Sequence, residues 1–242
     1  MPRFFVESVS PEDKIAVLTG EAAAHARVLR LKPGEQVVLC DGQGNDYLAE
    51  LSGMDAAGVT LKILSCGPSQ SEPGVDCTVY MGFAKGDKLE HVIQKATELG
   101  ANRICAFPSS RCVAKYDGKV LAKKLPRWQK IAASAAEQSG RGRIPTVFAA
   151  DSYAQALEMA AQADRALFFY ENEQSHTLTA ALEGDFSSAA IVTGPEGGFS
   201  EEEAAQAADA GLQICTLGKR ILRCETAPLC ALSAIMFAAG EY

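Results

Sequence analysis

The sequence predicts an α/β protein of two parts, a small β-rich unit followed by a larger parallel sheet with helices on both faces. Short apolar runs at close spacing fill residues 1–67, which is typical of a small barrel. From residue 77 onward strand-like and helix-like segments alternate, and this alternation predicts a parallel sheet covered on both sides. Between the two patterns, residues 66–76 are rich in Pro, Gly and Ser and indicate a linker. We therefore expect one domain at residues 1–72 and a second at residues 73–242.

Length and composition indicate a globular protein in a reducing compartment. Of 242 residues, 48% are hydrophobic and 22% are charged, which is ordinary for a folded soluble chain. The N-terminus lacks a charged region followed by an apolar core, so we expect no secretory signal, and the longest apolar stretch, residues 230–239, is too short to span a membrane. The eight cysteines are scattered, with no CxxC pair and no zinc-ligand spacing to the three histidines. We expect free thiols, no metal, no membrane association and a cytoplasmic location.

The first part contains five short apolar runs with strand-like composition. They are residues 4–6, 15–18, 36–40, 47–51 and 59–64. Asp41 and Gly42 form a turn dipeptide after the third run, so the third and fourth runs are expected to pair as a hairpin. The last run alternates apolar and polar residues and closes the unit.

One helix-like segment, residues 20–33, lies among these strands. Its apolar residues that are expected to face inward are Val28, Leu29 and Leu31. Arg27 and Arg30 would then face solvent. These two cations could contact phosphate groups, or the segment could be an ordinary amphipathic helix, and the pattern alone leaves both interpretations open.

The second part alternates strands and helices from residue 77 to residue 170. The expected strands are residues 77–83, 103–107, 146–149 and 165–170, and the expected helices are residues 87–99, 118–139 and 152–163. Gly100 follows the first helix at the position where a glycine commonly ends a helix. Pro126 lies inside the long central helix and is expected to interrupt it or to begin it afresh.

Charge is distributed unevenly along the chain. The net charge of −7 argues against a nucleic-acid partner, because phosphate binding requires a basic surface. However, residues 111–143 contain nine Lys or Arg and two acidic residues, whereas residues 144–211 contain twelve acidic residues and one Arg. This asymmetry predicts one basic face on an otherwise acidic body. The alternative is a helix with a solvated lysine face.

The C-terminal quarter contains two candidates for buried parallel strands, each followed by an unusual loop. Residues 189–192 lead into the glycine loop Gly194-Pro195-Glu196-Gly197-Gly198, and residues 212–217 lead into a basic loop at residues 218–223. In open α/β sheets, ligands bind beyond the carboxyl ends of the strands. Glycines let the backbone approach a ligand closely. The two loops together therefore form the candidate site.

The glycine loop by itself also admits a simpler interpretation, a tight turn between a strand and a helix. Ser200 and Glu203 have the spacing of a capping box, which predicts that a helix starts there. The chain has no GxxxxGK[ST] and no GxGxxG motif, so neither a P-loop nor a dinucleotide fingerprint accounts for the glycines. The basic loop that follows the second strand candidate favours a binding site over a simple turn.

The motifs of this quarter resemble those of a known enzyme class. GPEGGFS at residues 194–200 and LGKRILRCETAPL at residues 217–229 resemble the last two motifs of the SPOUT methyltransferases. Within that class the chain resembles the RsmE family, bacterial enzymes that methylate uracil N3 in 16S ribosomal RNA. Further motifs occur in family order and extend the resemblance over nearly the whole chain: MPRFF at 1–5, HARVLRL at 25–31, KGDKLEHVIQKATELG at 85–100, Ser110-Arg111, and EQSGR at 137–141.

The resemblance implies details of fold and assembly that spacing could not provide. It implies a PUA-like RNA-binding barrel at the N-terminus and a SPOUT-type parallel sheet whose C-terminal loops form a trefoil knot. It also implies a homodimer in which two subunits complete each site, with S-adenosylmethionine as the cofactor and 16S rRNA or the small ribosomal subunit as the partner. The cofactor-binding residues that it implies are Gly194, Glu196, Gly197, Leu217, Gly218, Ile221, Leu222 and Ala227.

The chemistry of uracil N3 suggests roles for residues of the basic loop. Loss of the N3 proton leaves negative charge on the neighbouring carbonyl oxygens, and Arg223 is the first candidate to stabilise it. Glu225 or a water would take the proton, and Thr226 would orient the base. Glu225 could instead be a helix-start carboxylate. The candidate RNA-binding residues are Arg27, Arg30, Arg111, Lys123, Lys124, Arg127 and Arg141.

Two other functions remain open at this point. A SPOUT enzyme could methylate a ribose 2′-oxygen in place of a base, and nucleoside analysis distinguishes the two products. A non-catalytic RNA-binding or ribosome-assembly factor would use the barrel and the basic helix alone, and failure to bind S-adenosylmethionine would favour it.

Overall fold

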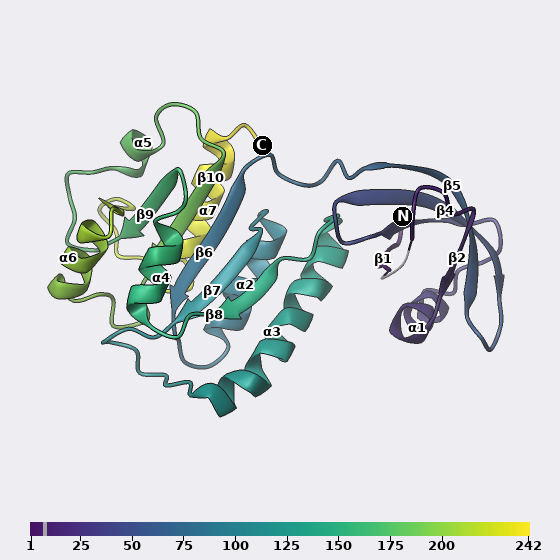
Figure 1. Ribbon diagram of the computed structural model, residues 1–242, viewed down its shortest axis with the longest axis horizontal. Helices are drawn as coiled ribbons and strands as arrows, with labels where there is room; N and C mark the ends of the chain where they lie inside the picture. The colour runs from purple at the N-terminus through teal and green to yellow at the C-terminus, as the bar shows by residue number, and fades with distance from the viewer. Residues whose placement is uncertain (7–8) are drawn as a thin grey trace. The chain divides into compact units, whose positions relative to one another are not determined.

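The computed structural model describes residues 1–6 and 9–242, which form two compact units (Figure 1). The N-terminal unit comprises Met1–Glu72 and Ala136–Ile144, and the C-terminal unit comprises Pro73–Ala135 and Pro145–Tyr242. The sequence predicts residues 136–144 in the second domain, whereas the structure groups them with the first unit. They pack with the N-terminal unit through contacts with residues that are distant in the sequence. A local sequence pattern does not show such contacts.

The N-terminal unit is a curled five-stranded sheet with one helix, and all five expected strands are present. The strand order is β1 (Arg3–Phe5), β3 (Gln36–Cys40), β4 (Asn45–Met54), β5 (Val59–Pro68) and β2 (Ile15–Leu18). β1 and β3 are parallel and the other neighbours are antiparallel, so the predicted β3–β4 hairpin is confirmed. The expected linker is shorter than residues 66–76, because β5 continues to Pro68 and β6 begins at Asp76.

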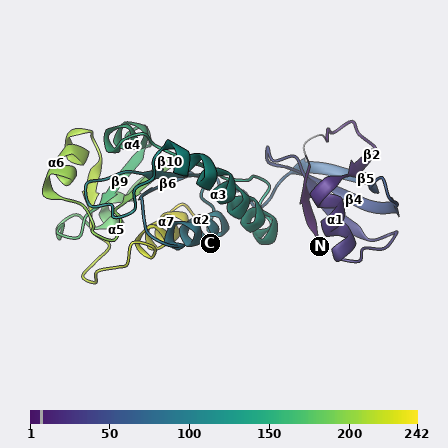
Figure 2. The same cartoon turned by 90° about the horizontal axis from the view of Figure 1, so that it is seen from below.

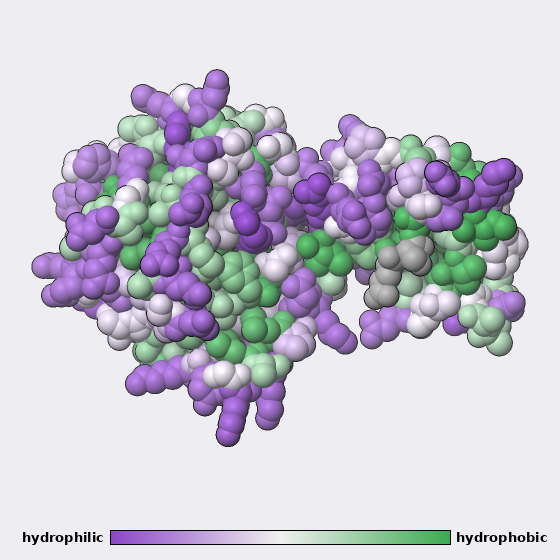
Figure 3. All heavy atoms as spheres, viewed as in Figure 1, coloured by the Kyte–Doolittle hydropathy of each residue, from purple (hydrophilic) through white to green (hydrophobic). Residues whose placement is uncertain are grey.

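The helix of this unit, α1 (Gly20–Val28), is shorter than expected and presents a different face to the core. Ala23 and Ala26 are its buried residues, and residues three apart share one face of a helix. Val28, two positions further on, therefore points away and is 77% exposed, and Leu29 beyond the helix end is 43% exposed. The expectation that these two residues face inward was wrong. Apolar surface is also visible on this unit in Figure 3.

The C-terminal unit is built on a parallel sheet, as predicted. The strand order is β11 (Gln213–Cys215), β9 (Arg165–Phe169), β10 (Ser188–Thr193), β6 (Asp76–Gly82), β7 (Arg103–Phe107) and β8 (Thr146–Ala149), and every pair is parallel. Helix α4 (Tyr153–Ala160) covers one face, and α2 (Lys88–Glu98) and α7 (Ala227–Ala238) cover the other (Figure 2). The expected arrangement of helices on both faces is confirmed.

The remaining helices mostly follow the expected signals. α3 (Gly118–Ser139) continues through Pro126 without a break. Pro126 is exposed, so water can solvate the carbonyl group that loses its hydrogen bond there. The capping box of α6 (Glu201–Asp209) is confirmed, and Gly100 ends α2 with a φ of 102°. The four-residue helix α5 (Leu178–Ala181) was not expected, because one turn is too short to show a periodic pattern.

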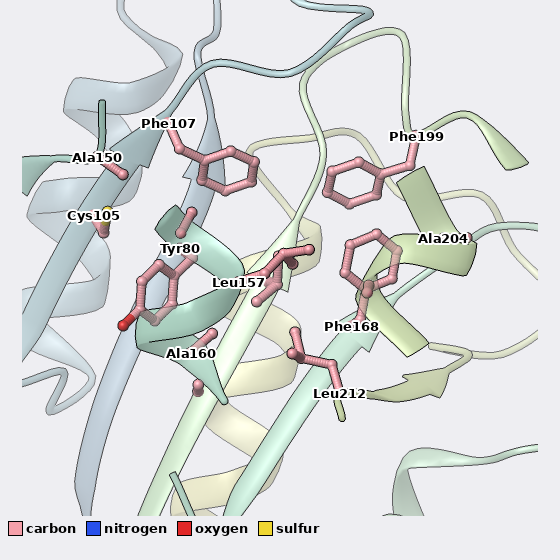
Figure 4. Packing of buried hydrophobic residues seen from close by; sticks show 14 residues of the cluster. Tyr80, Cys105, Phe107, Ala150, Leu157, Ala160, Phe168, Phe199, Ala204 and Leu212 are labelled. Carbon is pink, nitrogen blue, oxygen red and sulfur yellow. The ribbon is translucent and has the colours of Figure 1, made fainter. Parts of the chain in front are cut away.

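Aromatic rings in the core of the C-terminal unit anchor the loop that follows β10. Phe199 comes directly after the glycine loop and is buried, with its ring centroid 4.2 Å from that of Phe168 on β9. Phe107 stacks on Phe199 at 6.4 Å, and Leu157 and Leu212 belong to the same cluster (Figure 4). The end of the glycine loop is therefore fixed to the sheet.

None of the helices in the described residues is long and apolar enough to cross a membrane.

Candidate active site

Three loops at the carboxyl ends of neighbouring strands enclose a cavity of about 780 Å³ in the C-terminal unit. They are residues 170–177 after β9, residues 194–200 after β10 and residues 216–226 after β11. β9 lies between β11 and β10 in the sheet, so all three parallel strands end at one edge. This is where ligands bind in open α/β folds.

Most of the predicted cofactor-binding and catalytic residues line this cavity. Among them are the predicted cofactor-binding residues Gly194, Glu196, Leu217, Gly218, Ile221, Leu222 and Ala227, and the predicted catalytic residues Arg223 and Glu225. Gly197 and Thr226 do not line it. The structure thus brings together residues from two loops that are about twenty positions apart, while their individual roles stay predictions.

Gly197 faces a neighbouring segment, and its contact with the cofactor stays a prediction. A Cβ added at Gly197 would lie 3.0 Å from Arg111 Cβ and 3.1 Å from the Arg111 carbonyl oxygen. Arg111 Nη1 also donates a hydrogen bond to the Gly197 carbonyl oxygen at 3.2 Å. The close approach of Arg111 therefore favours glycine here. Arg111 is exposed beside the glycine loop.

Thr226 directly precedes α7 and does not line the cavity, and its role of orienting the base stays a prediction. It is the N-cap residue of α7, and its side chain makes no capping hydrogen bond. Its backbone N–H donates to the Arg223 carbonyl oxygen at 2.8 Å, and Ala227 N–H donates to the same oxygen at 3.0 Å. These bonds form the turn that holds the Arg223 backbone at the start of the helix.

Glu196 lines the cavity, but its carboxylate also binds the opposite loop. Glu196 Oε1 accepts hydrogen bonds from the Lys85 backbone N–H at 2.9 Å and from Lys88 Nζ at 3.0 Å. Partial burial raises the pKa of Glu196, but hydrogen bonds from backbone N–H groups and from Lys88 outweigh it and lower the pKa below its usual value. Glu196 is therefore an anion that joins the glycine loop to the start of α2.

The Arg223–Glu225 turn places a cation, a thiol and a carboxylate next to one another. Arg223 is exposed and lines the cavity. Cys224 Sγ donates to Glu225 Oε2 at 3.2 Å. Burial, followed by this hydrogen bond, raises the pKa of Cys224 to about 12, whereas a backbone hydrogen bond at Glu225 lowers the pKa of that carboxyl group. At neutral pH the thiol is neutral and Glu225 is ionised.

The loop after β9 supplies cavity residues that sequence reasoning missed. They are Phe169, Tyr170, Glu171, Glu173, Gln174 and Thr177. Glu173 Oε1 shapes this loop by accepting from Ser175 Oγ at 2.7 Å, Ser175 N–H at 2.6 Å and His176 N–H at 3.1 Å. These bonds, led by that of the Ser175 side chain, lower the pKa of Glu173 to about 2. The preceding strand, β9, was predicted. The loop after its carboxyl end could therefore have been recognised from the sequence as a candidate part of the site.

The predicted RNA-binding arginines of the N-terminal unit lie in different environments. Arg27 Nη2 donates to the Asp55 carbonyl oxygen at 2.6 Å, and Arg30 is exposed with a φ of 55°. Arg141 is only 2% exposed and forms a salt bridge with Glu72, with 2.7 Å between Nη2 and Oε2. The Arg141 guanidinium is thus occupied with Glu72 and holds residues 136–144 onto the barrel, while its contact with RNA stays a prediction.

The predicted basic residues of α3 also differ in their availability. Lys123 is exposed. Lys124 Nζ lies over the rings of Tyr116 and Trp128, at 4.9 Å and 5.5 Å from their centroids. Arg127 Nη2 is 2.7 Å from Glu90 Oε2.

The described residues contain no group of three His, Cys, Asp or Glu side chains that could hold a metal ion.

Comparisons with known proteins agree with this architecture. Residues 71–236 match the RNA methyltransferase domain family, and residues 18–64 match the RNA methyltransferase PUA domain family. The ribosomal RNA small subunit methyltransferase E of Bacillus subtilis (strain 168) is 36% identical, over 98% of this chain and 96% of that protein. Its namesake from Mycobacterium bovis is 33% identical, over 96% of this chain and 90% of that protein.

A solved structure extends the likeness to three dimensions. The crystal structure of a ribosomal RNA small subunit methyltransferase E from Neisseria gonorrhoeae, bound to S-adenosyl methionine, matches with a TM-score of 0.88. That protein is 34% identical, and the match covers 98% of this chain and 97% of that one. Sequence identity, domain content and fold agree over nearly the full length, and the chain therefore belongs to the ribosomal RNA small subunit methyltransferase E family, the RsmE family of SPOUT methyltransferases.

Proposed function

We propose that this protein transfers a methyl group from S-adenosylmethionine to N3 of a uracil in the 16S rRNA of the small ribosomal subunit. One observation carries the proposal: the residues of the two C-terminal motifs line a single cavity at the sheet edge. It is supported by the relative of the same fold that was crystallised with S-adenosyl methionine. The small-subunit rRNA in the names of the relatives supports the substrate.

The cavity fits the cofactor in size and in lining. Its volume of about 780 Å³ lies within the range of small-molecule sites, roughly 300–1,000 Å³. Backbone groups of Gly194 and Gly218 and side chains of Leu217, Ile221 and Ala227 line it, which suits an adenine and a ribose. An added Cβ at Gly194 would lie 3.0 Å from the Gly198 carbonyl carbon, so that backbone is too closely packed for a side chain. When bound, S-adenosylmethionine supplies an electrophilic methyl group on a sulfonium.

The residues of the Arg223–Glu225 turn would act on the target base. Arg223 would stabilise the negative charge that develops on the uracil carbonyl oxygens as N3 loses its proton. The lowered pKa of Glu225 keeps its carboxylate ionised at neutral pH, so that it can accept the N3 proton directly or through a bridging water.

RNA binding is proposed to involve both units. N3 lies on the pairing edge of uracil, so the target base must be unpaired or flipped out of a helix. The exposed cations Arg30, Arg111 and Lys123 would bind the phosphates around it. The match of residues 18–64 to an RNA methyltransferase PUA domain supports a role of the barrel in this binding.

We further propose a homodimer and a trefoil knot. α7 contains no charged residue, and its Phe237 is 72% exposed, which favours an apolar partner. A partner subunit on α7 would complete the site, whose basic loop leads directly into this helix. After β11 at the sheet edge, the chain returns to pack α7 against β10, β6 and α2, and this return supports a knotted C-terminus. The proposed place of action is the bacterial cytoplasm, where small ribosomal subunits are assembled.

The proposed function is tested by nucleoside analysis of 16S rRNA from cells with and without the gene, and of small subunits treated with purified protein. We expect one 3-methyluridine that depends on the gene and the cofactor. A 2′-O-methylated ribose would establish the sugar as the acceptor. RNA binding without cofactor binding would indicate an assembly factor. Arg223→Ala should retain cofactor affinity in calorimetry but lose transfer, whereas equal loss of both would assign Arg223 to cofactor binding.

A further inference from the structure

The loop between β6 and α2 places a lysine at the cavity that the proposed mechanism does not use. Lys88 is the first residue of α2 and lines the cavity with the Arg223–Glu225 turn. We propose that Lys88 is a second cation that contacts the target base, and that Glu196 is the positioning residue that holds its ammonium group at the reaction end. This inference rests on the proposed function, because it assigns Lys88 to the uracil that the proposed reaction methylates and not to the cofactor.

Glu196 fixes the position of the Lys88 ammonium group. Glu196 Oε1 accepts from Lys88 Nζ at 3.0 Å and from the Lys85 backbone N–H at 2.9 Å, so one oxygen binds both the loop backbone and the lysine head. An ammonium group carries three N–H donors. Within residues 1–6 and 9–242, Glu196 accepts the one hydrogen bond that Lys88 Nζ donates. Donors therefore remain for an oxygen of a ligand.

The loop between β6 and α2, which leads into Lys88, is also fixed by contacts with Tyr116. Tyr116 Oη donates to the Ala84 carbonyl oxygen at 2.7 Å, and its ring lies 4.9 Å from Phe83 and 5.9 Å from Trp128, centroid to centroid. At the end of β6, a Cβ added to Gly82 would lie 2.6 Å from Pro195 Cδ. The β6–α2 loop and the glycine loop are thus in direct contact. A lysine at the start of the helix that follows such a loop has a defined position, as electrostatic catalysis requires.

The charges around Lys88 favour a role as an electrophile and exclude a role as a base. Lys88 lines the same cavity as Arg223 and the two residues that follow it, Cys224 and Glu225. The hydrogen bond to Glu196 raises the pKa of Lys88, so the side chain stays protonated at neutral pH. Cys224 is a neutral thiol there, whereas the ionised Glu196 and Glu225 balance part of the Lys88 charge. A nearby cation favours the ionised form of an acid, so Lys88 would promote loss of the N3 proton.

The test compares four variants of the full-length protein. Lys88→Gln removes the charge, Lys88→Arg keeps it, and Glu196→Gln weakens the positioning. Lys95→Gln is the matched control, because Lys95 lies on the same helix, pairs with Glu98 at 2.8 Å and does not line the cavity. Cofactor affinity is measured by calorimetry. Single-turnover methyl transfer to small ribosomal subunits is followed from about pH 6 to about pH 10. This range lies above the usual pKa values of carboxyl groups, so only more weakly acidic groups change charge within it.

We expect Lys88→Gln to slow transfer at neutral pH about 100-fold, the typical effect of removing one preorganised donor. Its cofactor affinity should stay within about twofold of the wild type, a change of about 0.4 kcal/mol. The defect should shrink as pH rises, because uracil N3 then ionises without help. Lys88→Arg should recover most of the rate, and Glu196→Gln should show a smaller defect with the same pH dependence. Lys95→Gln should behave as the wild type.

Three results would overturn the assignment of Lys88. The first is a wild-type rate and pH profile in Lys88→Gln. The second is a parallel loss of cofactor affinity, which would place Lys88 at the cofactor. The third is an equal rate loss at every pH that Lys88→Arg does not relieve, which indicates a structural role only. Wild-type protein that binds the cofactor but leaves uracil N3 unmodified would refute the proposed function, and the Lys88 proposal with it.

Discussion

At the scale of single residues, Arg141 shows how burial decides a role that charge alone cannot. Its Nη2 and Nε donate to the two carboxylate oxygens of Glu72 at 2.7 Å and 3.1 Å, and Glu72 Oε1 also accepts from the backbone N–H groups of Gly142 and Arg143. Arg141→Met would leave the largely buried Glu72 carboxylate without its cation and with only the two backbone N–H donors, and removing one partner of a buried ion pair costs up to about 3–5 kcal/mol. We therefore expect a lower free energy of unfolding by that amount in urea titrations.

The control for this substitution is Lys123→Gln, since Lys123 is exposed. It should change the free energy of unfolding by less than about 0.5 kcal/mol. Folded Arg141→Met protein should bind RNA as the wild type does. An unchanged urea midpoint together with weaker RNA binding would return Arg141 to the RNA-binding set.

Sequence reasoning identified the chemistry of many residues but not their partners. Glu196 was expected in the cavity and lines it, yet its hydrogen bond to Lys88 joins residues 108 positions apart. No spacing rule shows such a pair. In the same way, the sequence shows that Arg141 is a cation, but only the fold shows that Glu72 surrounds it with acceptors. Residue type could be predicted, whereas burial and pairing required tertiary structure.

At the scale of elements, the glycine loop allows a sharp test of the cavity assignment. An added Cβ at Gly194 would lie 3.0–3.3 Å from backbone atoms of Gly198 within the same loop, and backbone cannot move aside cheaply. Gly194→Ala should therefore weaken cofactor binding about tenfold or more, equivalent to about 1.4 kcal/mol. Gly197→Ala would instead press on Arg111 outside the cavity, so we expect near-normal affinity and a loss of stability of about 1–3 kcal/mol.

Calorimetry with S-adenosylmethionine and thermal unfolding measure these two effects separately. Gly118→Ala is the control, because an added Cβ at Gly118 meets nothing within 4 Å. If Gly197→Ala lost more cofactor affinity than Gly194→Ala, the original assignment of Gly197 to the pocket would be restored.

Helix α3 is the second element whose role can be measured. Replacing Lys123, Lys124 and Arg127 together by Gln should weaken RNA binding and flatten its salt dependence, by about 0.7 in the log–log slope per lost phosphate contact. Lys124 lies over two aromatic rings and Arg127 pairs with Glu90. Lys123→Gln alone should therefore account for most of the change. Lys95→Gln serves as the control, and an unchanged slope in the triple variant would make α3 a solvated basic face.

Elements were predicted well where a local signal specifies them. The capping box of Ser200 and Glu203 and the glycine after α2 are interactions within one turn, and both are present. The third cavity loop, after β9, was missed although its strand was expected. Its contribution depends on β9 lying between β11 and β10, and strand order is a non-local property. The inward face of α1 failed for a related reason, since Ala23 and Ala26 and not the larger residues pack on the barrel.

At the scale of the whole molecule, alternating strands and helices predicted the parallel sheet, but spacing could give neither a knot nor a second subunit. Connections that thread one another are nearly absent among folds, so pattern alone predicts an unknotted chain. A partner subunit likewise leaves only an indirect trace in one sequence. That trace is an apolar helix with a face that its own unit does not cover, and α7 has this character.

The exposed face of α7 makes the dimer testable. Cys230 and Phe237 are seven residues apart, share one face of the helix and are both exposed. Phe237→Glu would place a charge in the proposed interface, and burying an unpaired charge is costly. We expect sedimentation to show a dimer for the wild type and a monomer for the variant. Phe237 is 72% exposed within its unit, so thermal unfolding should still show a folded protein.

Methyl transfer should be lost together with the dimer if two subunits complete each site. Raising the concentration of Phe237→Glu should restore part of the rate, since dissociation is reversed by mass action. Val28→Glu is the control, because Val28 is a 77% exposed apolar residue of the N-terminal unit, and it should remain a dimer. A monomeric wild type with full activity would show instead that one subunit contains the complete site, and α7 would then need another partner for its apolar face.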